Sequence, residues 1–295
     1  MISIVIPTYN YNITALLEAL NTQLEVLKTP YEVICYEDGS TKYIEANRTI
    51  TSKITHAKHV ISKENKGRIS TRQLLANTAT YDWLLFLDAD VVPKNTDFLQ
   101  QYINCLQTDY DAIYGGYFYT ITPPQKAFSL RWKYGKTYEQ VSAEIRNKNR
   151  YKIVISGNFL IKKSVFLDIN SKIDNDGYGY DNYFGALMKL HNTKVFHINN
   201  EAIHNGLDTN NVFLNKVEKA VETVAELYQK HTNLTTENTL LEVYKKFKAN
   251  GLSKPVQWIF KRCKLGLTKQ LLSSKPNLSL LQFYKLGYLC TLMSR

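Results

Sequence analysis

Apolar runs alternate with amphipathic stretches over the N-terminal third of the chain. Residues 2–6, 31–36 and 59–62 are short runs rich in apolar side chains, and each predicts a strand. Residues 14–27 carry leucine at helical spacing, and residues 69–78 would turn Leu74 and Leu75 inward, so each stretch predicts a helix. Strands that alternate with helices favour right-handed crossovers and a parallel sheet, so we expect the carboxyl ends of these strands along one edge.

A fourth strand is predicted over residues 83–87, and it ends directly in Asp88-Ala89-Asp90. This run is apolar on both faces, as in a strand buried inside a parallel sheet. Open α/β folds bind ligands at the carboxyl edge of the sheet, where these two acids would lie. The pair could hold Mg²⁺ or Mn²⁺ together with diphosphate oxygens, or it could be two solvated acids that merely end the strand.

The same edge should gather side chains of several chemical kinds. They comprise a hydroxyl, an aromatic ring, a separate acid, two cations and the carboxylate pair: Thr8, Tyr9, Asp38, Lys66, Arg72, Asp88 and Asp90. A nucleoside diphosphate requires an acid for its base or ribose, cations for its phosphates and a metal between them. The fingerprints G-x-G-x-x-G and G-x-x-x-x-G-K-[ST] are absent, which disfavours a dinucleotide enzyme and a P-loop NTPase.

The pattern is less regular in the second half of the chain. Residues 112–122 predict a strand interrupted by Gly115 and Gly116, and residues 123–152 predict a long loop that covers the substrate. A loop rich in glycine and acid follows at 174–182. The remaining elements are expected as follows: a strand at 153–161, a short helix near 165–169, a helix that ends near residue 191 and a strand at 195–198.

Composition indicates a folded globular protein whose positive charge belongs to its C-terminal tail. Of the 295 residues, 44% are hydrophobic and 21% are charged, which argues against general disorder. The net charge is +11, and eleven Lys and Arg follow Glu242 without another acid, so residues 1–242 are neutral overall.

Cysteine usage and the N-terminal residues indicate the compartment. The four cysteines are widely spaced, with no zinc-ligand spacing, as in a reducing environment. Met1 leads directly into the first strand, so we expect no signal peptide, and no apolar run approaches the ~20 residues of a membrane-spanning helix. We therefore expect a cytoplasmic protein, or one that is peripheral on the cytosolic face of the membrane.

Several motifs, in one order along the chain, resemble those of a single enzyme family. They are Ser3-Ile4-Val5-Ile6-Pro7-Thr8-Tyr9-Asn10, Glu37-Asp38-Gly39-Ser40, Asn65-Lys66-Gly67 with Arg72, Asp88-Ala89-Asp90, Gly157-Asn158-Phe159, Gly177-Tyr178-Gly179-Tyr180-Asp181, and His204. Over about residues 1–230 the chain resembles a family 2 glycosyltransferase of the GT-A fold. The resemblance implies a Rossmann-like, mostly parallel α/β sheet flanked by helices, with a nucleotide-binding half near 1–93 and an acceptor-binding half near 94–230. Residues 231–295 would add a basic helical C-terminal extension.

The resemblance also implies a set of residues around the donor nucleotide: Pro7, Thr8, Tyr9 and Asp38 around uridine, Lys66 and Arg72 near the nucleotide, and Asp88 at ribose and metal. Asp90 and His204 would bind the metal, Mn²⁺ or Mg²⁺. A lone histidine is more often a core or surface residue than a ligand. His204 follows a strand that returns to the same edge, which favours the ligand interpretation.

Members of this family transfer a sugar with inversion, while a carboxylate removes the proton of the acceptor hydroxyl. Their loop usually reads Gly-Tyr-Gly-x-Glu-Asp, with the Asp as base. Here it reads Gly-Tyr-Gly-Tyr-Asp181-Asn182, and the amide of Asn182 cannot accept a proton at neutral pH. The resemblance makes Asp181 the candidate base and Asp176 the reserve, although Asp181 could instead be only the N-cap of the following helix.

The basic tail is compatible with two structures. From residue 252 onward, Leu and aromatic side chains alternate with Lys and Arg, which suits a helix lying on an anionic membrane surface through residues 243–295. Residues 280–293 could form a second such helix. The same sequence also suits a helical pair packed on the catalytic domain. A role in binding nucleic acid is disfavoured, because the tail has no recognisable motif and the remainder is neutral.

Three functions from different classes remain. The first is a metal-dependent glycosyltransferase that uses a nucleotide-sugar, with UDP as the expected nucleotide, on a saccharide or lipid-linked acceptor in surface polysaccharide or glycolipid synthesis. The second is a haloacid-dehalogenase-like phosphatase, because Asp88-Ala89-Asp90-Val91-Val92 fits that pattern too. Such enzymes carry the pair after the first strand and need a later Gly-Asp loop, neither of which is present. The third is a catalytically weakened nucleotide-sugar-binding protein, which Asn182 suggests.

Overall fold

The computed structural model describes residues 1–122, 124–173, 177–230 and 238–294. The chain divides into two compact units. The first comprises Met1–Tyr119, Glu139–Asp176 and Leu187–Gly206, and the second comprises Thr120–Tyr138, Gly177–Ala186 and Leu207–Arg295. The boundary predicted at residue 230 falls inside the second unit.

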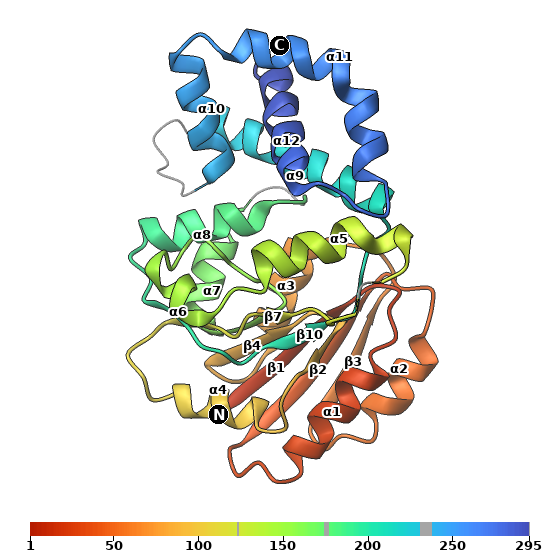
Figure 1. Ribbon diagram of the computed structural model, residues 1–295. Helices are drawn as coiled ribbons and strands as arrows, with labels where there is room; N and C mark the ends of the chain where they lie inside the picture. The colour runs from red at the N-terminus through yellow and green to blue at the C-terminus, as the bar shows by residue number, and fades with distance from the viewer. Residues whose placement is uncertain (123, 174–176, 231–237, 295) are drawn as a thin grey trace. The chain divides into compact units, whose positions relative to one another are not determined.

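A seven-stranded sheet forms the centre of the first unit (Figure 1). In order across the sheet, the strands are β3 (Ala57–Ser62), β2 (Tyr31–Asp38), β1 (Ile2–Thr8), β4 (Trp83–Leu87), β8 (Asn158–Lys162), β6 (Ala112–Tyr114) and β9 (Val195–His197). β1 to β4 are mutually parallel, β6 is parallel to β9, and β8 alone runs antiparallel to its neighbours β4 and β6. The predicted mostly parallel α/β sheet is confirmed, and the ends of β1 to β4 share one edge.

Six helices of the described residues flank this sheet, most of them through buried apolar side chains. They are α1 (Thr14–Leu24), α2 (Ile44–Thr51), α3 (Arg68–Thr78), α4 (Phe98–Cys105), α6 (Ala143–Lys148) and α7 (Lys163–Asn170). α1 packs against α2 and α4, while α3 packs against α7 and β1. α1 ends three residues before the predicted end, because Leu27 donates its amide to Leu24 in a tightened turn shortly before Pro30.

A second, three-stranded sheet was not predicted. Its order is β5 (Val91–Pro93), β10 (Ala202–His204) and β7 (Tyr117–Phe118). The single strand expected at 112–122 is instead divided between the two sheets at Gly115 and Gly116. A Cβ on Gly115 would lie 2.3 Å from the carbonyl oxygen of Asn200, so only glycine allows the backbone to cross there.

The segment expected to be a long loop at 123–152 is largely helical in its described residues. It contains the short elements η1 (Lys126–Phe128), α5 (Ser129–Tyr134), η2 (Gly135–Glu139) and α6. The prediction of a loop was wrong here, because contacts distant in sequence hold these turns. The Asn210 side chain, for example, accepts the Leu130 amide at 2.8 Å.

The C-terminal helices of the second unit build a core of their own. They are α9 (Asn210–Lys230), α10 (Thr239–Ala249), α11 (Ser253–Leu271) and α12 (Leu278–Leu292), shown as the cyan-to-blue group in Figure 1. Phe213, Phe260 and Leu281 lie in one buried cluster, and Val221 and Leu289 lie in another. α12 therefore contributes its apolar residues to the core of this unit, and a place for it on a membrane surface remains a prediction.

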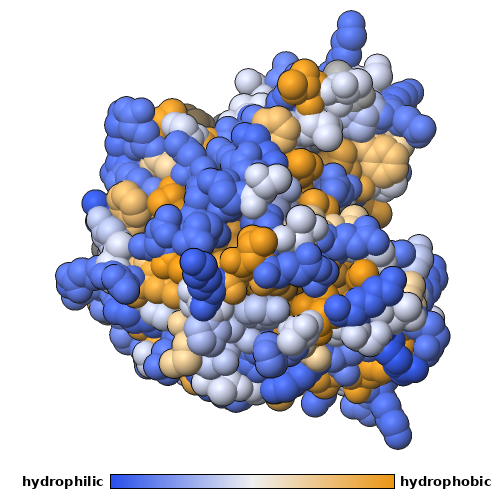
Figure 2. Space-filling model, turned by 90° about the horizontal axis from the view of Figure 1, so that it is seen from below, coloured by the Kyte–Doolittle hydropathy of each residue, from blue (hydrophilic) through white to orange (hydrophobic). Residues whose placement is uncertain are grey.

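No helix within the described residues is both long and apolar enough to cross a bilayer. The face drawn in Figure 2 is mostly hydrophilic, with apolar residues in patches between polar ones. Such scattered apolar residues are ordinary on a folded protein, so a patch needs a further feature before it indicates a partner.

Candidate active site

The loops after β1 and β2 are fastened to each other by Asn10. Its side-chain oxygen accepts hydrogen bonds from the backbone amides of Thr41 at 2.7 Å and Lys42 at 3.0 Å. Its backbone amide donates to Ser40 Oγ at 2.9 Å. Asn10 has φ of 50°, a left-handed conformation that asparagine tolerates better than most residues. Thr8 is buried beside this junction, while Tyr9 is 57% exposed and available to a ligand.

Asp38, at the end of β2, holds the loop that precedes α3. Its carboxylate accepts the amides of Lys66 at 2.7 Å and Gly67 at 3.0 Å, and its carbonyl oxygen accepts from Asn65 Nδ2 at 3.0 Å. Both carboxylate oxygens of Asp38 are therefore used within the protein. The position of Asp38 beside the uridine remains a prediction. In the structure, Asp38 holds this loop in place. Lys66 itself is exposed.

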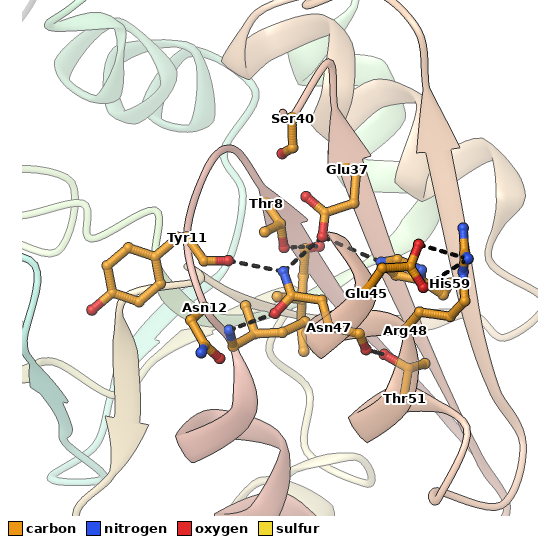
Figure 3. Close-up of polar contacts among 12 residues, drawn as sticks. Thr8, Tyr11, Asn12, Glu37, Ser40, Glu45, Asn47, Arg48, Thr51 and His59 are labelled. Atoms are coloured by element: carbon orange, nitrogen blue, oxygen red, sulfur yellow. Dashed lines mark hydrogen bonds and ion pairs between the residues drawn. The ribbon is translucent and has the colours of Figure 1, made fainter. Parts of the chain in front are cut away.

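Figure 3 shows a cluster of polar contacts that joins Glu37 at the end of β2 to His59 of β3 and Asn47 of α2. Glu37 Oε1 accepts from Asn47 Nδ2 at 2.7 Å and lies 3.2 Å from His59 Nε2. Asn47 also donates to the Tyr11 carbonyl at 2.9 Å and accepts the Ile13 amide at 3.0 Å. The cluster thereby fixes the turn between β1 and α1, and sequence reasoning missed it.

Asp88 lies in a cationic and hydroxylic environment at the end of β4. Arg72 of α3 bonds to Oδ1, Arg68 approaches Oδ2 at 4.0 Å, and the Tyr117 hydroxyl donates to Oδ2 at 3.3 Å. Burial alone would raise the pKa of Asp88, but the positive charges of Arg72 and Arg68 outweigh it and lower the pKa. Arg72 is only 6% exposed and holds Asp88 in place, and its predicted position near the nucleotide remains a prediction.

Asp90 faces a different partner. Its Oδ2 lies 3.6 Å from His204 Nε2 of β10, and its backbone oxygen accepts the Asn205 amide at 2.9 Å. Burial raises the pKa of Asp90, His204 opposes that shift, and the negative charge of Asp88 adds to it. The raised pKa indicates that the positive charge near Asp90 is too small to offset its burial and the negative charge of Asp88.

The second sheet brings His204 to this place. β10 pairs with β5, and His204 stands opposite Val91, the residue after Asp90. The rings of Tyr117 and Tyr119 lie 5.0 and 5.4 Å from the His204 ring, centroid to centroid. Packing between two tyrosines fixes the imidazole, so the predicted proximity of His204 to Asp90 is a feature of the fold.

Asp90 and His204 could hold a divalent cation through two donors. Asp90 Oδ2 and His204 Nε2 are closer than about twice a Mg²⁺–ligand distance of 2.1 Å, so one ion can contact both. The pKa of Asp90 is raised, as expected of a carboxylate that receives a cation. Within the described residues no three His, Cys, Asp or Glu are grouped to hold a metal, so diphosphate oxygens or water would complete the shell.

Two glycines next to these acids were missed as site residues. A Cβ on Gly157 would lie 2.0 Å from the Tyr117 hydroxyl and 2.3 Å from Asp88 Oδ2. A Cβ on Gly206 would lie 1.9 Å from Asp90 Oδ2. Both positions are close to motifs visible in the sequence, but only the fold shows that glycine is needed there to leave room for a carboxylate.

Asn158, the residue after Gly157, forms hydrogen bonds that hold the backbone next to the site. It is fully buried and donates Nδ2 to the carbonyls of Gly116 at 2.8 Å and Asn200 at 2.9 Å, while Tyr102 donates to its Oδ1 at 2.7 Å. The Gly-Asn motif therefore joins the two sheets at the point where the chain passes from β6 to β7.

The candidate base belongs to the second unit. α8 (Tyr180–Leu190) begins one residue before Asp181, so Asp181 lies in the first helical turn and is not the N-cap. An acid there is favoured by the helix dipole in any case. Asp181 is half-buried and Asn182 is exposed. Asp176, the reserve candidate, lies outside the described residues, and the roles of both acids remain predictions.

A family model described as glycosyl transferase family 2 matches residues 3–169, which is more than half of the chain. The chain belongs to glycosyl transferase family 2. A Haemophilus influenzae protein named "Uncharacterized glycosyltransferase" is 37% identical to it over 93 residues, covering 30% of this chain and 29% of that protein. The match thus spans less than a third of this relative.

Solved glycosyltransferase structures share the fold of this family 2 member. The mannosyltransferase PcManGT from Pyrobaculum calidifontis, in complex with GDP-Man and Mn²⁺, has a TM-score of 0.56 at 12% identity, over 99% of this chain and 85% of that one. S. aureus TarS 1-349 in complex with UDP-GlcNAc has a TM-score of 0.52 at 17% identity, over 99% and 90% of the two chains. The predicted family and GT-A fold are confirmed, and the phosphatase and binding-protein alternatives are not favoured.

Proposed function

We propose that this family 2 member moves a sugar from a UDP-sugar to a saccharide or lipid-linked acceptor, with inversion, in the synthesis of a surface polysaccharide or glycolipid. The observation that carries the proposal is the arrangement of Asp88, Asp90 and His204 at the carboxyl edge of the sheet. Solved relatives of similar fold were crystallised with UDP-GlcNAc or with GDP-Man and Mn²⁺, which supports a nucleotide-sugar donor in general.

The residues around this edge have separate tasks in the proposal. Tyr9 would contact the nucleotide base, and Lys66, at the tip of the loop held by Asp38, would approach a phosphate. Asp88, kept ionised by Arg72, would accept from a ribose hydroxyl. Asp90 and His204 would hold Mn²⁺ or Mg²⁺, which supplies positive charge for the departing diphosphate.

Asp181 would accept the proton of the attacking hydroxyl. Asp181 lies in the first turn of α8. Its carboxylate can act as a general base, whereas the neighbouring amide of Asn182 cannot.

A donor screen tests the proposal. UDP-, GDP- and TDP-sugars are incubated with the enzyme and a mixture of saccharide and lipid-linked acceptors, with and without Mn²⁺, and nucleotide release is followed. We expect release from a UDP-sugar that requires a divalent cation and is lost in Asp90→Asn. The control Asp82→Asn changes an exposed acid at the start of β4 and should leave release unchanged.

Two outcomes would contradict the proposal. Hydrolysis of a phosphate ester that is lost in Asp88→Asn would indicate phosphatase chemistry. Tight Mn²⁺-dependent binding of a UDP-sugar, with neither transfer nor hydrolysis for any acceptor, would indicate a binding protein.

A further inference from the structure

α11 has one face in the core of its unit and an opposite face with unusual composition. Val256, Phe260, Leu267 and Leu271 are buried, and their spacing of four, seven and four residues places them on one side of the helix. This side accounts for the stability of the helix within its unit. The residues on the other side are free to serve another purpose.

The opposite side combines exposed apolar residues with positive charge. Trp258 is 59% exposed and Leu265 is 81% exposed. The residues at matching helical positions around them are all basic, and together the six define the α11 outer face: Lys254, Trp258, Lys261, Arg262, Leu265 and Lys269. All six are exposed, and α11 contains no acidic residue.

The charges on this face are not neutralised by the protein. Among the residues that the structure describes, no acid forms an ion pair with Lys254, Lys261 or Lys269. Arg262 stacks on the Trp258 ring at 4.7 Å, which holds the indole outward. Lys264 differs from them, because it points to the inner side and pairs with Glu218 at 3.0 Å. On α11, the basic residues that lack an acidic partner therefore lie on the outer face.

We propose that the α11 outer face docks on an anionic lipid bilayer. An interfacial helix places tryptophan and leucine at the headgroup boundary and surrounds them with Lys and Arg that meet acidic headgroups. Trp258 and Leu265 lie about two turns apart along α11, with basic residues between and beside them. A nucleic acid would use the cations and could stack on Trp258, but it offers nothing for the aliphatic side chain of Leu265. A bilayer accommodates all six residues.

The test compares two triple variants with the same change in charge. Lys254→Gln/Lys261→Gln/Lys269→Gln removes three charges from the α11 outer face. The matched control changes Lys245, Lys246 and Lys248, which are exposed on α10, to Gln. Full-length proteins are sedimented with vesicles of phosphatidylcholine containing phosphatidylglycerol, and with vesicles of phosphatidylcholine alone, at low and high salt.

We expect wild-type protein to bind only the anionic vesicles, and less tightly at high salt. About 1 kcal/mol for each basic residue near the surface corresponds to about a fivefold loss per residue, so the α11 triple variant should bind about a hundredfold more weakly. The α10 variant should bind nearly as well as wild type. Wild-type Trp fluorescence should shift to the blue on binding, and that shift should disappear in Trp258→Phe, since Trp258 leaves water.

Three results would overturn the proposal. Wild-type protein that ignores anionic vesicles at low salt would exclude docking. Equal losses in the two triple variants would attribute binding to total charge and not to this face. Tighter binding to a duplex or single-stranded oligonucleotide than to the vesicles, abolished in the α11 variant, would make the face a nucleic-acid site. All variants change exposed side chains, and unchanged thermal unfolding verifies that they fold.

Discussion

Gly206→Ala would add one carbon directly against the Asp90 carboxylate. The new Cβ would lie 1.9 Å from Asp90 Oδ2 and 2.6 Å from its Cγ. Non-bonded heavy atoms reach their optimum at roughly 3.5 Å, so the carboxylate must retreat by about 1.5 Å. The backbone can move little in response, because the Asn205 amide donates to the Asp90 carbonyl at 2.9 Å.

This displacement sets the expected size of the effect. Asp90 Oδ2 lies 3.6 Å from His204 Nε2, and a shift of that size would separate two atoms proposed to share one cation. A misplacement of about 1 Å in a catalytic site can cost on the order of 10²-fold in rate. Turnover should therefore fall about a hundredfold, while overpacking costs about 1–3 kcal/mol of folding free energy.

The assay measures Mn²⁺-dependent nucleotide release from the donor and thermal unfolding of the same preparations. The control is Gly266→Ala in α11, where an added Cβ meets nothing within 4 Å. That variant should keep full turnover and gain up to about 1 kcal/mol of stability, since alanine favours a helix over glycine. A folded Gly206→Ala enzyme with near-normal turnover and unchanged Mn²⁺ requirement would refute the reasoning.

Three further predictions concern other parts of the fold. Arg72→Met should lower the free energy of unfolding by about 3 kcal/mol in a urea titration, because Asp88 loses its main buried partner; a change below about 1 kcal/mol would show that the pair matters little. Burial alone would raise the pKa of Glu32, but hydrogen bonds from a backbone amide, two hydroxyls and a lysine lower it. Its stabilisation is therefore present above the usual pKa and lost as the pH falls through the folded value, so Glu32→Gln should flatten the acid limb of a stability–pH curve, and an unchanged limb would contradict this. Asp181→Asn should lower turnover by roughly 10²–10⁴-fold with donor affinity kept, whereas Asn182→Asp should leave turnover unchanged or raise it; near-normal turnover in Asp181→Asn would move the base elsewhere.

The parts of the fold that the sequence predicts are those whose signal is local. β1 and β4 are buried on both faces, and a predominantly apolar run marks such strands without knowledge of their neighbours. Because parallel strands end at one edge, the placement of Asp38, Asp88 and Asp90 at the same edge of the sheet followed from the alternation of strands and helices.

The second sheet could not be predicted, because its strands carry no local signal in the sequence. β7 has two residues and β5 and β10 have three each, too few to show a period. Their pairing joins segments far apart in the chain, and it is this pairing that brings Tyr117 against Asp88 and His204 beside Asp90. The need for glycine at 157 and 206 follows from those contacts and has no local signature.

The helical character of residues 126–148 was hidden by their composition. α5 and α6 have six residues each, with basic and aromatic side chains that suggested a loop. Arg146 illustrates what overrides this tendency, since its buried guanidinium donates to the carbonyls of Gly115 at 3.1 Å and Ile198 at 2.8 Å. Arg146 thus supplies hydrogen bonds that backbone carbonyls in two loops would otherwise receive from a neighbouring strand. The sequence alone does not show these contacts.

Calorimetric titration of UDP into the protein with and without Mn²⁺ tests the central claim most directly, because it needs neither the sugar nor the acceptor to be known. Wild-type protein should bind UDP tightly only when Mn²⁺ is present. Asp90→Asn should lose the metal-dependent part of the affinity, and His204→Ala should weaken it less, since Asp90 and the diphosphate still hold the cation. Binding of UDP that is equally tight without Mn²⁺, or unchanged Mn²⁺-dependent binding in Asp90→Asn, would contradict the account.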